Sequence, residues 1–140
     1  MPLDKKLINR KITLIRKDLK SLSFLVKLSL KTYLSKPEYE ALAERYLERI
    51  IGRILDINYH ILAGKENHIP LDYYNSFIDL GRKKYLPMEF AERLADSAGL
   101  RNRLAHEYDE IDERKIYQAA KSCLKDVPKY LNYIVKSLKI

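Results

Sequence analysis

The chain has 140 residues, 46% of them hydrophobic, which suits one domain with a buried core. Its 27 Lys and Arg against 19 Asp and Glu give a net charge of +8, which favours polyanionic partners, although a solvated lysine-rich surface explains it equally well. No stretch has the apolar length of a membrane span, and Cys123 has no second cysteine to pair with. The charged N-terminal segment does not resemble a secretion signal, so we expect a cytoplasmic protein.

The first predicted element is a long helix from about Asp4 to Leu34. Apolar residues recur at steps of three or four between Leu7 and Leu30, which is the spacing of one helix face. Asp4 can cap the start of this helix, and the sequence Ser35-Lys36-Pro37 should end it.

A second helix should begin at Pro37, because proline is favourable in a first helical turn. Apolar spacing carries this helix to about Leu62, and Gly64 suits its end. After a polar loop, a short third helix is predicted over residues 71–80, and Gly81 should stop it.

The last two predicted helices make up the C-terminal third of the chain. One should run from Pro87 to about Tyr108, and the other from Glu113 to Leu138 with Asp112 as its cap. Pro128 should kink or split the final helix, because it removes one backbone donor. We therefore predict one all-α domain over residues 1–140, a bundle of about five helices with a kink or break near Pro128.

The predicted fourth helix contains a charged residue in an unexpected place. On a wheel of about 100° per residue, its apolar side chains form one arc, and Arg101 falls near the middle of that arc. A guanidinium there is costly unless it is paired or opens onto a cleft. Arg101 is therefore either a functional residue or one whose aliphatic stem passes the core and carries the charge to solvent.

Polar groups gather around Arg101. Asn102 and His106 are four residues apart and can meet on one helix face, and Gly99 near that face leaves room for a ligand or another chain. Tyr108 shares a face with Arg101. A cation that binds phosphate, together with a group that titrates near neutrality, meets the needs of metal-free RNA cleavage. The competing interpretation is that a lone His after an Asn is structural.

The sequence from Arg101 to Tyr108, Arg-Asn-Arg-Leu-Ala-His-Glu-Tyr, resembles the signature of HEPN nucleases. Glu107-Tyr108 and the downstream Ile111-Asp112 resemble the HepT branch, the toxins of MNT–HEPN systems. The similarity spans about residues 37–136 and includes Leu55 to His60 and Pro70 to Leu80.

This resemblance implies a HEPN-type helical bundle that forms a homodimer and cuts RNA without a metal or other cofactor. Arg101 would bind the scissile phosphate, His106 would transfer protons, and Asn102 would orient His106 or the substrate. The implied partner is a nucleotidyltransferase (MNT) antitoxin of a type VII-like toxin–antitoxin system, which would transfer AMP to Tyr108. The alternative is a catalytically silent HEPN module that binds nucleotide or docks a nucleotidyltransferase.

Two histidines lie outside this motif. Asp56 and His60 are four residues apart, so they can form a helical pair that supports the site, while a capping or packing role for His60 is the alternative. His68 lies in a polar loop where we expect it to be solvated, and no third ligand with suitable spacing joins it and His60 in a metal site. Most of the 11 tyrosines are expected in the core or a dimer interface.

Overall fold

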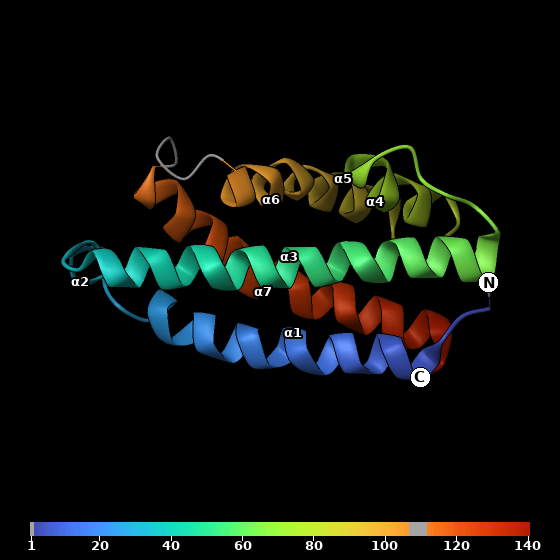
Figure 1. Cartoon of the computed structure of the whole chain (residues 1–140), viewed down its shortest axis with the longest axis horizontal. Coiled ribbons are helices and arrows are strands. Elements are labelled where there is room, and N and C mark those ends of the chain that lie inside the picture. The colour runs from blue at the N-terminus through green and yellow to red at the C-terminus, as the bar shows by residue number, and fades with distance from the viewer. Residues whose placement is uncertain (1, 107–111) are drawn as a thin grey trace.

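The computed structural model describes residues 2–106 and 112–140, and at residues 101, 102 and 104–106 it describes the backbone alone. All regular secondary structure in these residues is helical, which confirms the predicted all-α bundle (Figure 1). The helices are α1 (Lys5–Val26), α2 (Leu30–Leu34), α3 (Pro37–Glu66), α4 (Tyr73–Arg82), α5 (Met88–Ala95), α6 (Ser97–His106) and α7 (Glu113–Leu138).

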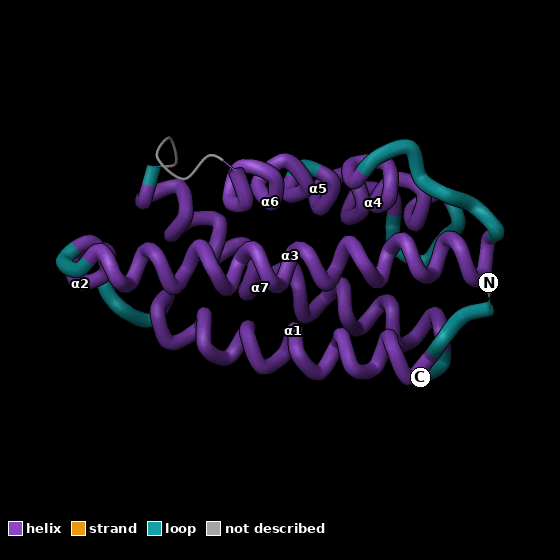
Figure 2. The backbone as a smooth tube through the Cα atoms, in the orientation of Figure 1, coloured by secondary structure: helices purple, strands orange, loops and turns teal. Residues whose placement is uncertain are grey.

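The N-terminal helix begins as predicted but ends early. The carboxylate of Asp4 accepts a hydrogen bond from the backbone N–H of Leu7 at 3.1 Å, as an N-cap does. The predicted continuous helix to Leu34 is wrong, because the chain leaves the helix after Val26 and starts the short α2 with Ser29 as a new cap. Figure 2 shows this interruption at the end of the bundle where α2 lies.

Helix α3 occupies the middle of the fold, with α1 on one side and the row of α4, α5 and α6 on the other (Figure 1). It begins at Pro37 as predicted, but Gly64 does not end it. The helix continues to Glu66 and ends at Asn67, which takes up a left-handed conformation with φ of 49°. Asn tolerates this conformation because its short polar side chain can hydrogen-bond locally.

The short helices α4 and α5 pack closely together. Asp72 caps α4 by accepting from the backbone N–H of Asn75 at 2.8 Å. Gly81 was expected to stop this helix, but it lies inside it and is buried. A Cβ at Gly81 would stand 2.9 Å from the Cβ of Ala91, so the glycine lets α5 approach α4.

Helix α7 has the predicted bounds. The carboxylate of Asp112 caps its first turn by accepting from the backbone N–H of Arg114 at 2.8 Å. The helix is continuous through Pro128, so the break that we allowed for there does not occur. Within the described helices, none is both long enough and apolar enough to cross a membrane.

The core lies among α1, α3, α4 and α7, and it holds a few polar side chains. Asp18 of α1 is buried and pairs with Arg53 at 2.6 Å and with Arg49 at 3.2 Å, both on α3. Because a buried carboxylate without a partner is costly, these two arginines make its position between the helices tolerable. Burial and paired charges therefore hold α1 against α3 in one register.

Candidate active site

The residues predicted to form the active site lie on α6, a helix separate from α5. The predicted helix from Pro87 to Tyr108 is wrong, because α5 ends at Ala95 and the chain turns at Asp96. The hydroxyl of Ser97 donates to the backbone carbonyl of Leu94 at 2.6 Å and so satisfies a group freed by that turn. The predicted apolar arc around Arg101 came from one helical wheel drawn through residues of both α5 and α6. Because these are two helices, that arc does not describe the surroundings of Arg101.

Arg101, Asn102 and His106 all belong to α6, where the structure describes their backbone positions. Tyr108 lies outside the described residues. At about 100° per residue, the Cα positions of Asn102 and His106 fall between those of Ala98 and Gly99 around the helix axis. The side of α6 that carries Ala98 and Gly99 is thus also the side of these two motif positions.

On this side of α6 lies a hollow of about 410 Å³ lined by aromatic residues, which we name the aromatic hollow. The described residues that line it are Tyr59, Asp72, Tyr73, Tyr74, Ala98 and Gly99. The rings of Tyr59 and Tyr73 meet edge to face, with centroids 6.0 Å apart and planes at 82°.

Among the described residues that line the aromatic hollow, the polar side chains are the tyrosine phenols and the carboxylate of Asp72. Burial, followed by the nearby Tyr73 and Asp72, raises the pKa of Tyr59, so its phenol keeps its proton and can donate a hydrogen bond. Among the described atoms, none lies within 4 Å of a Cβ added to Gly99, so these residues leave this part of the helix backbone open to a ligand.

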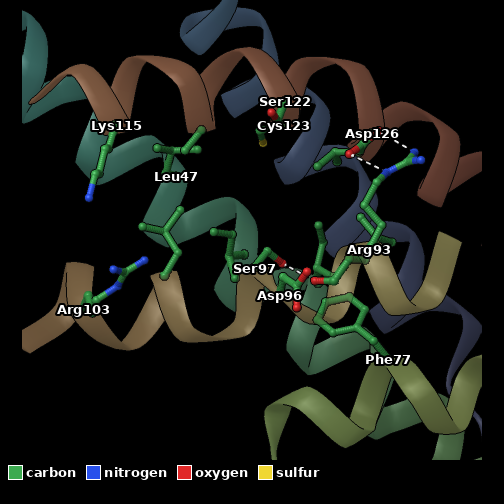
Figure 3. A pocket seen from close by; sticks show the side chains of 16 residues that line it. Leu47, Phe77, Arg93, Asp96, Ser97, Arg103, Lys115, Ser122, Cys123 and Asp126 are labelled. Atoms are coloured by element: carbon green, nitrogen blue, oxygen red, sulfur yellow. Dashed lines mark hydrogen bonds and ion pairs between the residues drawn. The ribbon is translucent and has the colours of Figure 1, made fainter. Parts of the chain in front are cut away.

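A second cavity, of about 380 Å³, lies on the other side of α6 and is mostly apolar. From α6 it is lined by Ser97, Leu100 and Arg103, which are three residues apart and share a face. Figure 3 shows Arg103 of α6 and Lys115 of α7 pointing toward one another from opposite walls. These two cations carry positive charge along the motif helix, where a polyanion would be attracted.

Away from these cations, an ion pair forms part of the wall of the apolar cavity. The guanidinium of Arg93 donates to both carboxylate oxygens of Asp126, at 2.9 and 3.4 Å, and joins α5 to α7 (Figure 3). Burial raises the pKa of the nearby Cys123 thiol to about 12, with a further contribution from Asp126. Cys123 is therefore a protonated and unreactive thiol at neutral pH.

Asp56 and His60 both contact the N-terminal segment. The carboxylate of Asp56 pairs with Lys11 at 2.8 Å, and Nε2 of His60 accepts a hydrogen bond from the backbone N–H of Asp4 at 2.8 Å. His60 thus satisfies a backbone N–H at the start of α1, which is the capping role that the sequence offered as an alternative to a role in the active site. Among the described contacts, none joins either side chain to α6.

Sequence reasoning missed two polar contacts. His68 was expected in solvent, but its Nε2 lies 2.8 Å from Oδ2 of Asp79. The other carboxylate oxygen of Asp79 pairs with Arg82.

A buried hydrogen-bond network also went unpredicted: the Tyr130 hydroxyl donates to Asn58 at 2.6 Å, and the Asn58 amide donates to Ser76 at 3.1 Å. The only available signal was an Asn in the apolar run of the second predicted helix. Among the described side chains, no three His, Cys, Asp or Glu groups cluster as metal ligands do.

Residues 15–134 match the family described as Ribonuclease HepT-like. The chain is 37% identical over 128 residues to the tRNA nuclease HepT of Aphanizomenon flos-aquae, an alignment that covers 91% of this chain and 87% of that protein.

Three solved structures share the fold. One is a toxin–antitoxin complex with AMP-PNP, with 20% identity, a TM-score of 0.83 and coverage of 92% of this chain and 97% of that one. Another is a tri-AMPylated Shewanella oneidensis HEPN toxin in complex with its MNT antitoxin, with 22% identity, a TM-score of 0.82 and coverage of 91% and 96%. The third is YutE of Bacillus subtilis, a cytosolic protein of unknown function, with 19% identity, a TM-score of 0.77 and coverage of 96% and 92%.

The sequence match and the shared helical architecture agree with the resemblance that the stretch from Arg101 to Tyr108 predicted. The matched region contains α6 and most of the helices that surround it. The chain belongs to the HepT-like ribonuclease family.

Proposed function

We propose that this chain is the toxin of a HEPN/MNT toxin–antitoxin pair and a metal-independent endoribonuclease that cuts tRNA. The observation that carries the proposal is the 37% identity to a tRNA nuclease over most of both chains. The helix α6 supports it, because that helix bears Arg101, Asn102 and His106 within ten residues. The whole chain would act as a single domain.

In the proposed reaction, the ribose 2′-hydroxyl attacks the adjacent phosphate. His106 accepts the proton of that hydroxyl, and the new O2′–P bond displaces the 5′-oxygen of the next nucleotide, which takes up a proton in turn. Arg101 binds the non-bridging oxygens and stabilises their developing charge, while Asn102 orients His106 or the substrate. The products are a 2′,3′-cyclic phosphate and a 5′-hydroxyl end.

We further propose that two copies of the chain form the working enzyme and that the antitoxin controls it at Tyr108. Two motif helices related by a two-fold axis would double the positive charge presented to the RNA. The phenol oxygen of Tyr108 would attack the α-phosphate of ATP on the antitoxin and release pyrophosphate. The attached AMP would then place anionic oxygens beside Arg101 and block the substrate phosphate.

The test is incubation of purified chain, free of any partner, with tRNA in the presence of EDTA. Cleavage should persist and leave cyclic phosphate ends, which mass spectrometry of the fragments identifies. Activity that requires an added divalent ion would contradict the proposed mechanism. RNA or nucleotide binding without any cleavage would instead favour a catalytically silent module.

A further inference from the structure

The aromatic hollow lies on the side of α6 that carries the motif positions Asn102 and His106, and the proposed chemistry leaves it without a role. We propose that the aromatic hollow is a subsite that holds one unstacked base of the RNA beside the scissile phosphate. This inference rests on the proposed function, because it needs an RNA substrate on α6.

The register of α6 brings the hollow close to two of the three motif positions, Asn102 and His106. Asn102 comes three residues after Gly99, and His106 comes seven residues after Gly99. At 1.5 Å per residue, the two positions lie about 4.5 and 10.5 Å farther along the helix axis than Gly99. A phosphate held beside the Asn102 and His106 positions would therefore have its neighbouring base near Gly99. The apolar cavity that contains Arg103 lies on the other side of the helix and does not compete for this base.

The tyrosine rings provide surfaces on which a base can stack. Tyr73 and Tyr74 are 36% and 46% exposed, although large apolar and aromatic side chains of this fold are mostly buried. Their neighbour Tyr59 holds Tyr73 in an edge-to-face contact, which fixes the ring before any ligand binds. Aromatic platforms of this kind bind unpaired bases through stacking.

The charge of Asp72 favours a base over a phosphate in the hollow. One oxygen of its carboxylate accepts from both the backbone and the side-chain nitrogen of Asn75, at 2.8 and 2.9 Å, so the group is fixed at the start of α4. A carboxylate repels phosphate but accepts hydrogen bonds from the amino groups of bases. The base would therefore enter the hollow, and the sugar–phosphate chain would stay on the side of α6.

The test uses RNA that carries 2-aminopurine at the nucleotide next to the cleavage site and a 2′-deoxyribose at the scissile position. The missing 2′-hydroxyl prevents cleavage, and stacking in the hollow should quench the fluorescence of the probe. Replacing Tyr73 or Tyr74 with alanine should remove the quenching and weaken RNA binding roughly 5- to 150-fold, the range for loss of one stacked base. Tyr73→Phe keeps the aromatic ring and should retain both the fluorescence quenching and the RNA affinity of the parent.

Gly99 offers a matched pair of variants. Gly99→Leu should fill the hollow and block the base, whereas Gly99→Ala should leave room for it, and both residues favour a helix more than glycine does. Tyr133→Ala is the control for loss of an aromatic, because Tyr133 is 39% exposed but lies on α7 against Phe90. That control should quench and bind as the parent does.

Three outcomes would overturn the proposal. In the first, the parent cleaves RNA but Tyr73→Ala, Tyr74→Ala and Gly99→Leu bind and quench as it does. In the second, these variants turn a dimer into a monomer in sedimentation experiments, which would make the hollow a subunit contact. The nearby Ile69 and Leu71, 81% and 87% exposed, make that the main competing role. In the third, the parent neither cuts nor binds RNA, and the proposed function fails with it.

Discussion

Replacing Glu44 with glutamine should stabilise the fold at alkaline pH and flatten its pH dependence. Glu44 lies on α3 near Glu40 and the buried Tyr33, where one of its oxygens has no described hydrogen-bond partner. Burial, followed by the charge of Glu40 and a hydrogen bond with it, raises the pKa of Glu44 from its ordinary 4.5 to about 7.

The sign of the effect follows from proton linkage. The folded chain holds a proton on Glu44 that the unfolded chain releases, so stability should fall as pH rises from about 4.5 to about 7. A fully enclosed group with this difference would cost about 3 kcal/mol above pH 7. Glu44 is only partly buried, and solvent screening reduces the cost to on the order of 1 kcal/mol. Glutamine carries no charge to desolvate, so Glu44→Gln removes this cost.

The measurement is urea unfolding of the parent and the variant between pH 5 and pH 9, with circular dichroism as the signal. The two free energies of unfolding should agree near pH 5 more closely than at pH 8, where the variant should be the more stable. Glu40→Gln removes one cause of the raised pKa but not burial, so its pH dependence should lie between the other two. Equal slopes for the parent and Glu44→Gln would refute the reasoning.

Three further predictions concern the proposed function. His106→Ala and Arg101→Ala should lose RNA cleavage at least 100-fold while circular dichroism and thermal melts stay close to the parent's; parental activity in both would rule out the site. Tyr108→Phe should retain RNase activity and escape the antitoxin, and intact mass spectrometry after co-expression should find added AMP on the parent alone. Light scattering should give a dimer, and a fully active monomer would contradict the two-fold arrangement.

The sequence predicted the helices well where their ends depend on local groups. Asp112 and the apolar spacing after it define α7 completely, because a cap and a periodic face are both readable within a few residues. The interruption after Val26 has one local signal, the Ser29 cap of α2, but the apolar spacing runs across it to Leu30 and hides it. The hydroxyl of Tyr117 on α7 donates to the carbonyls of Val26 and Leu28, at 3.3 and 2.8 Å, and so supports the freed backbone. That partner lies about 90 residues away in sequence.

In the candidate site, too, the features that depend on nearby residues were predictable from the sequence, and those that depend on distant segments were not. The spacing of Arg101, Asn102 and His106 is local, and it placed all three on one helix without knowledge of the fold. The surroundings of that helix are not local. The aromatic hollow joins Tyr59 of α3 and Tyr73 at the start of α4 to Gly99 of α6. No pattern within any one of these segments indicates that they meet.

The buried polar network explains how the wall of the hollow is held in place. Tyr130 of α7 donates to Asn58 of α3, Asn58 donates to Ser76 of α4, and the Ser76 hydroxyl donates to the backbone carbonyl of Tyr73 at 2.7 Å. Because an unsatisfied polar group would be costly at these buried positions, each bond restricts its neighbours to one arrangement. The chain of contacts ends at the first turn of α4, where Tyr73 enters the hollow. The core polar groups therefore fix a surface residue of the proposed base subsite, and they connect the packing of three helices to recognition beside α6.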